Sequence, residues 1–387
     1  MQNVKCIESL RAYMAWWVVV SHAIGIIGIY DTGSKLLNLP LKLITWSSMP
    51  VNIFIIVSGF VITHLFLAKK EKYSVYITRR FFRIFPIYLF CILFAMSLFY
   101  FQHLVYMDIS FSANKHVRLA MWKSQDENFW THLLLHLSML HGLIPDSILK
   151  YGTSVFLGPA WSLSLEWQFY LLAPIIIGLM ARGVMPLIST ALILYLLGLV
   201  AKSGVLGTWN YPAFLFLSIQ YFLIGIISRL AIEQFKDSKY LWELLVVAMV
   251  TFALANVIET FIWVCFFSIA LIEVGRVNKV PNSINKVLNI FVLNNIVSSL
   301  GKWSYSTYLI HIPLLVLIIG SVGFAFGAEF FTPQRLVLVV LASFPIIIAV
   351  SWLLYSTIEL GGINLGKRIA NHVKQQDVGK PVEVVRS

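Results

Sequence analysis

The chain has 387 residues, of which 59% are hydrophobic and only 12% are charged, and its mean hydropathy is +0.83. A soluble domain carries about 25% charged residues, so this composition excludes an ordinary soluble protein. It predicts an all-α integral membrane protein that crosses the bilayer many times. The net charge of +12 is compatible with a nucleic-acid partner at first sight, but the placement of the charges argues against one.

Long uncharged runs set the number of membrane spans. The first run continues for about 19 residues without a small-residue cleavage site, so we expect a retained span and no cleaved signal peptide. Hydropathy predicts a bundle of about ten transmembrane helices. Their expected ranges are 12–30, 46–67, 84–106, 158–180, 184–201, 212–230, 241–257, 260–275, 303–322 and 336–357.

Three further segments complete the organisation. Residues 287–300 are too short to span and contain three asparagines, so we expect an interfacial helix. Residues 107–157 form the one long outer segment. We divide the chain into a membrane domain, residues 1–360, and a polar cytoplasmic tail, residues 361–387. The odd cysteine count makes a disulfide framework improbable, and we expect packing roles instead.

The basic residues predict the orientation. Placing the N-terminus in the cytoplasm assigns 21 of the 29 Lys and Arg residues to the cytoplasmic side. This asymmetry follows the positive-inside rule and explains the basic charge without any nucleic acid. Both termini are therefore expected in the cytoplasm. The outer side receives Lys35, Lys42, Lys115, Arg118, Lys123, Lys150, Lys202 and Arg335.

Two ionisable residues lie in the first apolar run. Arg11 and His22 are eleven positions apart, which places them within about 20° on one helix face and roughly 16 Å apart along the axis. Arg11 falls at the cytoplasmic end and His22 near the membrane midplane. The structural alternative is a snorkelling arginine and a histidine hydrogen-bonded between helices. The functional interpretation is a buried imidazole that acts as a base or nucleophile.

A basic cluster precedes the third predicted helix. Arg80 and Arg83 are three residues apart and share one helix face at the membrane entrance. The positive-inside rule alone explains part of this cluster. Guanidinium groups are also suited to holding phosphates, so a phosphate-bearing cytoplasmic donor would fit here.

Two polar stretches lie in later spans. The stretch 161–170 places Ser162 and Glu166 on one helix face, and Glu166 is an intramembrane acid that needs a partner or a function. Its tryptophans and tyrosine can equally form an aromatic belt. The stretch 304–311 forms a polar stripe that ends at His311, also near mid-membrane. Two histidines and one acid from three helices are therefore expected to meet at similar depth.

A weaker pattern lies in the outer segment. His132 and His136 have the i, i+4 spacing of metal ligands, and His141 follows. Neither a cysteine nor a suitably placed acid completes the set, so we predict no metal site.

Taken together, five motifs resemble the membrane acyltransferase-3 family in the family's order, over about residues 5–360. The resemblance rests on Arg11-x10-His22, Ser58-Gly59-Phe60, Arg80-x-x-Arg83, Trp161-Ser-Leu-x-x-Glu166-x-Gln-Phe-Tyr170 and Ser304-Tyr-x-x-Tyr-x-x-His311. Similar members are bacterial enzymes that O-acetylate exopolysaccharide or lipopolysaccharide. The family resemblance implies an enzyme of the bacterial inner membrane that takes an acyl group from cytoplasmic acyl-CoA, with no permanently bound cofactor, and transfers it to a sugar hydroxyl.

The resemblance also implies residue roles. Arg11 and His22 become the essential pair, and Arg80 and Arg83 contact the donor phosphates. Glu166 and the stripe from Ser304 to His311 line the transfer path. Two departures matter: Trp167 stands where an acid often follows Glu166, and the secreted hydrolase-like domain that some relatives carry at the C-terminus is absent from this sequence.

We therefore predict an O-acyltransferase, most simply an acetyltransferase, for a cell-surface or lipid-linked glycan. His22 is expected to deprotonate the sugar hydroxyl or to carry the acyl group transiently, with Glu166 or His311 orienting the acceptor or shuttling protons. A transporter or flippase for a lipid-linked glycan is the rival, although the sequence has no internal repeat of the kind that transporters often show. A non-catalytic scaffold is a third alternative. The expected substrate-binding residues are Arg11, Arg80, Arg83, Trp161, Ser304, Tyr305 and Tyr308.

Overall fold

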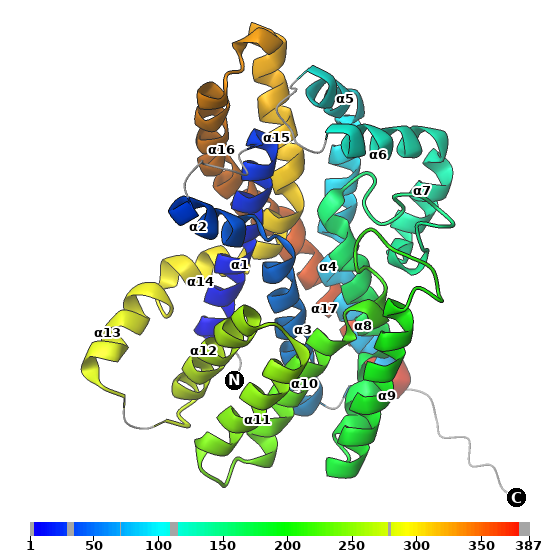
Figure 1. Ribbon diagram of the computed structural model, residues 1–387. Helices are drawn as coiled ribbons and strands as arrows, with labels where there is room; N and C mark the ends of the chain where they lie inside the picture. Colours follow the sequence, from blue (N-terminus) through cyan, green and yellow to red (C-terminus); the bar gives the residue numbers. More distant parts are fainter. Residues whose placement is uncertain (1–3, 29–34, 70, 109–114, 278–279, 379–387) are drawn as a thin grey trace, which may run out of the picture.

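The computed structural model describes residues 4–28, 35–69, 71–108, 115–277 and 280–378, and every regular element within these ranges is a helix (Figure 1). Seven of these helices are long and apolar enough to cross a membrane. They are α1 (Lys5–Ile27), α3 (Ser48–Ala68), α4 (Tyr73–Ser97), α8 (Trp161–Met180), α9 (Val184–Lys202), α15 (Ser304–Phe326) and α16 (Pro333–Leu354), the last of which continues without a break into the next helix.

The other elements connect these spans or flank them. The remaining α-helices are α2 (Lys35–Thr45), α5 (Phe99–Asp108), α6 (Lys115–Glu127), α7 (Phe129–Leu137), α10 (Ile219–Gln234), α11 (Tyr240–Leu254), α12 (Val257–Glu273), α13 (Asn282–Phe291), α14 (Asn295–Lys302) and α17 (Leu360–Val378). Short 3₁₀ turns are η1 (His141–Leu143), η2 (Gly158–Ala160), η3 (Leu215–Leu217) and η4 (Ala328–Phe330), and η5 (Tyr355–Glu359) is a π-helical turn.

The structure confirms an all-helical membrane protein. A helix overlaps each of the ten predicted ranges, although the range 84–106 is divided between α4 and α5, and α10, α11 and α12 have only 16, 15 and 17 residues. A helix that crosses the bilayer core needs about 20 residues, so the count of ten spans and the sides of the termini stay predictions. The predicted span 212–230 begins only at Ile219, because the chain forms turns and η3 after Pro212.

Other predicted boundaries also differ from the structure. Helix α4 begins at Tyr73, well before the predicted residue 84, so it includes Arg80 and Arg83, which the sequence places on one helix face. The segment 287–300, predicted as one helix, is divided into α13 and α14. The division occurs at Asn294, whose side chain accepts a hydrogen bond from the Val297 amide and caps a new helix.

The predicted tail contains a packed helix. Residues 361–378 belong to α17, which lies along α4. A Cβ atom at Gly362 would lie 2.6 Å from the Phe82 carbonyl oxygen, and one at Gly366 would lie 2.6 Å from the Phe82 Cβ. These glycines allow the two helices to approach closely. Residues 379–387 of the tail lie outside the described part of the chain.

The bundle centre depends on similar close approaches between backbones. A Cβ atom at Gly225 of α10 would lie 2.1 Å from the Ile56 carbonyl oxygen of α3, and one at Gly59 would lie 2.5 Å from the Phe222 carbonyl oxygen. Small residues at such contacts are typical of packed transmembrane helices. Around this centre, α5, α6 and α7 gather at one end of the bundle, and α9 lies at its side (Figure 1).

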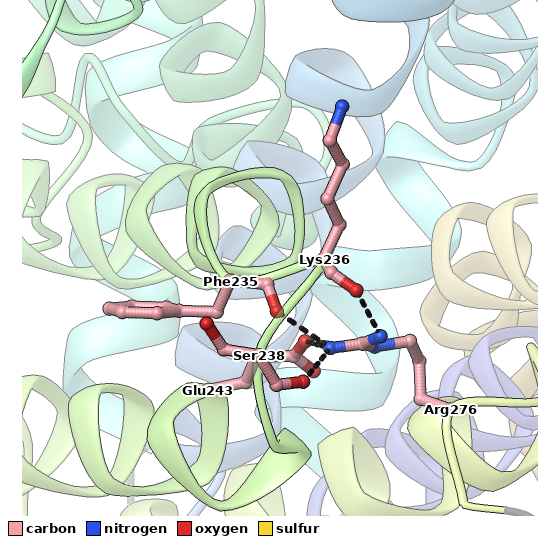
Figure 2. A network of polar contacts seen from close by, with 5 residues as sticks. All are labelled: Phe235, Lys236, Ser238, Glu243 and Arg276. Atoms are coloured by element: carbon pink, nitrogen blue, oxygen red, sulfur yellow. Dashed lines mark hydrogen bonds and ion pairs between the residues drawn. The ribbon is translucent and has the colours of Figure 1, made fainter.

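A single arginine holds the ends of α10, α11 and α12 together (Figure 2). Arg276 donates to the carbonyl oxygens of Phe235, Lys236 and Ser238, and its Nε lies 2.9 Å from Oε1 of Glu243. Glu243 is completely buried, so this ion pair supplies the counter-charge that a buried carboxylate requires.

Candidate active site

A cavity of about 360 Å³ opens between α1, α3, α4, α8, α14 and α15. It gathers most of the predicted site residues from helices far apart in sequence. Arg11, Arg80, Arg83, Glu166, Ser304, Tyr305 and Tyr308 all line it. Trp161 does not line this cavity; it is buried and stacks on Tyr211 with ring centroids 5.8 Å apart.

The residues follow the same order along two helices, α1 and α15. Arg11 lines the cavity on α1, and His22 lies about three turns further along the same helix. Ser304 and Tyr308 line the cavity on α15, and His311 follows in the next turn. The cavity therefore leads from the basic residues toward the two histidines.

Glu166 has two hydroxyl partners at the cavity wall. Ser58 Oγ donates to Glu166 Oε1 over 3.0 Å, and the Tyr170 hydroxyl donates to the same oxygen. The guanidinium carbon of Arg80 lies 5.9 Å from the centroid of the Tyr170 ring. Among the described residues, Arg80 Nε has no hydrogen-bond partner. The intramembrane acid thus has its partners, and a cationic donor beside them is unsatisfied.

Ser162 and Tyr308 close the histidine end of the cavity. Ser162 Oγ donates to the Tyr308 hydroxyl over 2.9 Å, and that hydroxyl donates to the Pro159 carbonyl oxygen over 3.2 Å. The Tyr308 ring lies 6.2 Å from the ring of His311, centroid to centroid. His22 and His311 do not line this cavity, and Tyr308 is a lining residue whose ring lies next to His311.

His22 and His311 meet, as the sequence predicts. Their ring centroids lie 5.3 Å apart, and His311 is completely buried. His311 Nδ1 lies 3.2 Å from the Thr307 carbonyl oxygen, which can only accept, so this contact assigns the proton to Nδ1. Nε2 then carries a lone pair and has no partner within the described residues. The carboxylate of Glu166 joins Ser58 and Tyr170 instead of either imidazole.

Glu359 is an acid beside the site that the sequence patterns do not predict. It is 2% exposed and accepts a hydrogen bond of 2.9 Å from Ser306 Oγ. Glu359 and Arg83 line one further cavity together. It lies in the π-helical turn η5, a feature often found at functional sites. An acid directly after the long apolar run 336–357 was the available indication.

The outer histidines pack against each other. The rings of His136 and His141 stack with centroids 4.1 Å apart, and His141 Nε2 lies 3.3 Å from the Ala160 carbonyl oxygen. Burial lowers the pKa of His136 to about 4 and that of His141 well below its usual value. Within the described ranges, no three His, Cys, Asp or Glu side chains are arranged to hold a metal ion.

The comparison with protein families agrees with this architecture. A family model described as an acyltransferase domain matches residues 4–356, nearly the whole chain. The chain therefore belongs to the membrane acyltransferase-3 family and is a membrane acyltransferase. No curated protein and no solved structure matched the chain in the corresponding searches.

Proposed function

We propose that the protein is an O-acyltransferase of the bacterial inner membrane that moves an acyl group, most simply acetyl, from cytoplasmic acyl-CoA to a hydroxyl of a cell-surface or lipid-linked glycan. One observation carries the proposal: a cavity with basic residues at its wall extends along α1 and α15 toward a pair of histidines that lie beyond Tyr308. The arginines suit an anionic donor, and the histidines suit proton transfer.

The chemistry needs one base and one path for the thioester. The charged part of the donor stays at the arginines while its acyl thioester extends past Ser162 and Tyr308. In direct transfer, an imidazole nitrogen of His22 takes the proton of the acceptor hydroxyl as its oxygen attacks the thioester carbonyl. The tetrahedral intermediate then releases the CoA thiolate, which receives the proton. In this scheme Nε2 of His311, which has no hydrogen-bond partner among the described residues, passes protons to and from His22; the two rings lie 5.3 Å apart, centroid to centroid.

A covalent route uses the same atoms. His22 attacks the thioester carbonyl, CoA leaves as the thiol, and the resulting acyl-imidazole then acylates the sugar hydroxyl. In either route one thioester bond breaks, one ester bond forms, and one proton moves from the acceptor to CoA.

The test uses the full chain in lipid nanodiscs. Acetyl-CoA and a lipid-linked saccharide fraction are added, and free CoA is measured with a thiol reagent. CoA release that depends on the acceptor and is lost in His22→Ala supports the proposal. Flux of saccharide across vesicles without any acyl donor supports the transporter instead. In cells, the surface polysaccharide of a deletion strain is expected to lack one ester.

A further inference from the structure

A second cavity of about 380 Å³ lies next to the first. The two cavities share the wall residues Glu8, Arg83 and Lys302. The second cavity is also lined by Lys5, Asn295, Ser298, Ser299, Tyr355, Glu359 and Ile363.

Two helices order the cavities in the same direction. Along α1, Lys5 lines the second cavity, Glu8 lines both, and Arg11 lines the first. Along α14 and α15, Ser298 lines the second cavity, Lys302 lines both, and Tyr308 lines the first. The second cavity therefore lies at the end of the path that is furthest from His22 and His311.

The charges of the second cavity favour an anion. Its cations are Lys5, Arg83 and Lys302 and its acids are Glu8 and Glu359, so the cations exceed the acids by one. Oε1 of Glu8 lies 3.5 Å from Nη1 of Arg11, and Glu359 accepts a hydrogen bond from the Ser306 hydroxyl. Lys302 is exposed and can turn its ammonium group toward a ligand.

The two predicted phosphate contacts, Arg80 and Arg83, differ in which cavity they line. Arg83 lines both cavities, whereas Arg80 lines only the first and lies over the Tyr170 ring. Arg83 is thus at the junction of the two cavities, and Arg80 lies beside Tyr170, the partner of Glu166. A donor that spans both cavities would meet Arg83 where its phosphates end and its uncharged arm begins.

We propose that the second cavity binds the phosphate-bearing nucleotide portion of acyl-CoA through Lys302, Lys5 and Arg83, with the hydroxyls of Ser298 and Ser299 as additional donors. This subsite rests on the proposed function for its natural ligand. It assigns a role to α14, which the sequence indicates only as an interfacial helix.

The test compares two donors that differ only in the nucleotide portion. Lys302→Gln is expected to raise KM for acetyl-CoA about tenfold. The same variant is expected to change kcat/KM for S-acetylpantetheine, which has no nucleotide and no phosphate, much less than kcat/KM for acetyl-CoA. Lys286→Gln is the matched control, because Lys286 is exposed on α13 and lines neither cavity. Equal effects on both donors, or no effect on either, would overturn the subsite and leave the proposed function standing.

A binding measurement tests the subsite without catalysis. Adenosine 3′,5′-bisphosphate is titrated into the protein in phosphatidylcholine nanodiscs by calorimetry. Wild type and Lys286→Gln are expected to bind it, and Lys302→Glu is expected to lose binding at an unchanged melting temperature. Binding that phosphatidylglycerol abolishes would assign the cavity to a lipid headgroup and refute the proposal. Absence of acyl transfer by wild type from either donor would refute the proposed function, while this titration still decides the subsite.

Discussion

The imidazole rings of His22 and His311 lie with their centroids 5.3 Å apart and their planes inclined by 47°. One ring comes from α1 and the other from α15, and neither helix alone defines their meeting point. Because the Thr307 carbonyl holds the proton of His311 on Nδ1, Nε2 stays free for a proton of the reaction. The two rings are therefore expected to work as one unit.

The first prediction concerns this unit. His22→Ala and His311→Ala are each expected to lower kcat by about two to four orders of magnitude, as the loss of a general acid or base does. The kcat of the double variant is expected to be only slightly lower than that of the less active single variant, because the effects of residues that act together do not add. Acceptor-dependent CoA release in nanodiscs measures these rates. His372→Ala, at an exposed position on α17, is the control. If the fold-loss of kcat in the double variant equals the product of the two single fold-losses, the two histidines act separately.

The second prediction concerns the charge at Glu166. Glu166→Gln keeps the shape of the side chain and removes the carboxylate that accepts from Ser58 and Tyr170. Hydrogen bonds to charged groups contribute about 1.5–3 kcal/mol, so kcat/KM is expected to fall at least about tenfold. Ser58→Ala is expected to have a smaller effect, because the Tyr170 contact stays. Glu329→Gln, at an exposed position, provides the control. Wild-type kinetics for Glu166→Gln would remove this residue from the site.

The third prediction concerns the contact between α1 and α14. A Cβ atom at Gly301 would lie 1.8 Å from the Glu8 carbonyl oxygen, so Gly301→Ala must push the helices apart. Overpacking of this kind costs about 1–3 kcal/mol and is expected to lower the melting temperature. Because Glu8 and Lys302 line both cavities, KM for acetyl-CoA is expected to rise as well. Gly361→Ala, where a Cβ atom would meet nothing within 4 Å, is expected to behave as wild type.

Hydropathy and spacing were sufficient for the helices and for much of the site. Apolar runs predict a helix at each of ten places. The i, i+11 spacing places Arg11 and His22 on one helix face, and the i, i+4 spacing does the same for Ser162 and Glu166. The stripe on α15 was found because polar residues in an apolar span are costly. These properties are local in sequence.

The missed features depend on packing between distant segments. Lys302 and Glu8 become site residues only because α14 crosses α1 at Gly301. Glu359 and Arg83 line one cavity although they lie on helices far apart in the sequence. The expected meeting of Glu166 with the histidines likewise depends on the relative heights of separate helices, and in the structure the Glu166 carboxylate contacts Ser58 and Tyr170 instead. No periodicity within one helix specifies such offsets.

The fourth prediction concerns Arg276 (Figure 2). Arg276→Ala leaves Glu243 buried without its cation and frees three carbonyl oxygens, so the loss of stability is expected to reach about 3–5 kcal/mol. Arg276→Ala with Glu243→Gln is expected to recover part of this loss, because the second change removes the buried charge. Thermal unfolding in detergent measures both. Arg335→Ala is the control, because Arg335 is exposed and lies on α16, outside this network. A single variant as stable as wild type would show that the clamp is dispensable.

The fifth prediction concerns pH and the buried ring of His136. Its pKa is about 4 in the folded protein and 6.5 in the unfolded chain, because burial disfavours the charged imidazole. The unfolded state therefore binds the proton first, and the stability that the neutral ring contributes is complete above the unfolded pKa. It is lost as the pH falls from 6.5 toward 4, by about 2 kcal/mol between pH 7 and pH 5. Denaturant unfolding of wild type and His136→Gln at the two pH values measures the difference, and the variant is expected to show the shallower dependence. His116→Gln, exposed on α6, is expected to follow wild type. Equal pH dependence in wild type and His136→Gln would mean that His136 titrates in the folded protein as it does in the unfolded chain.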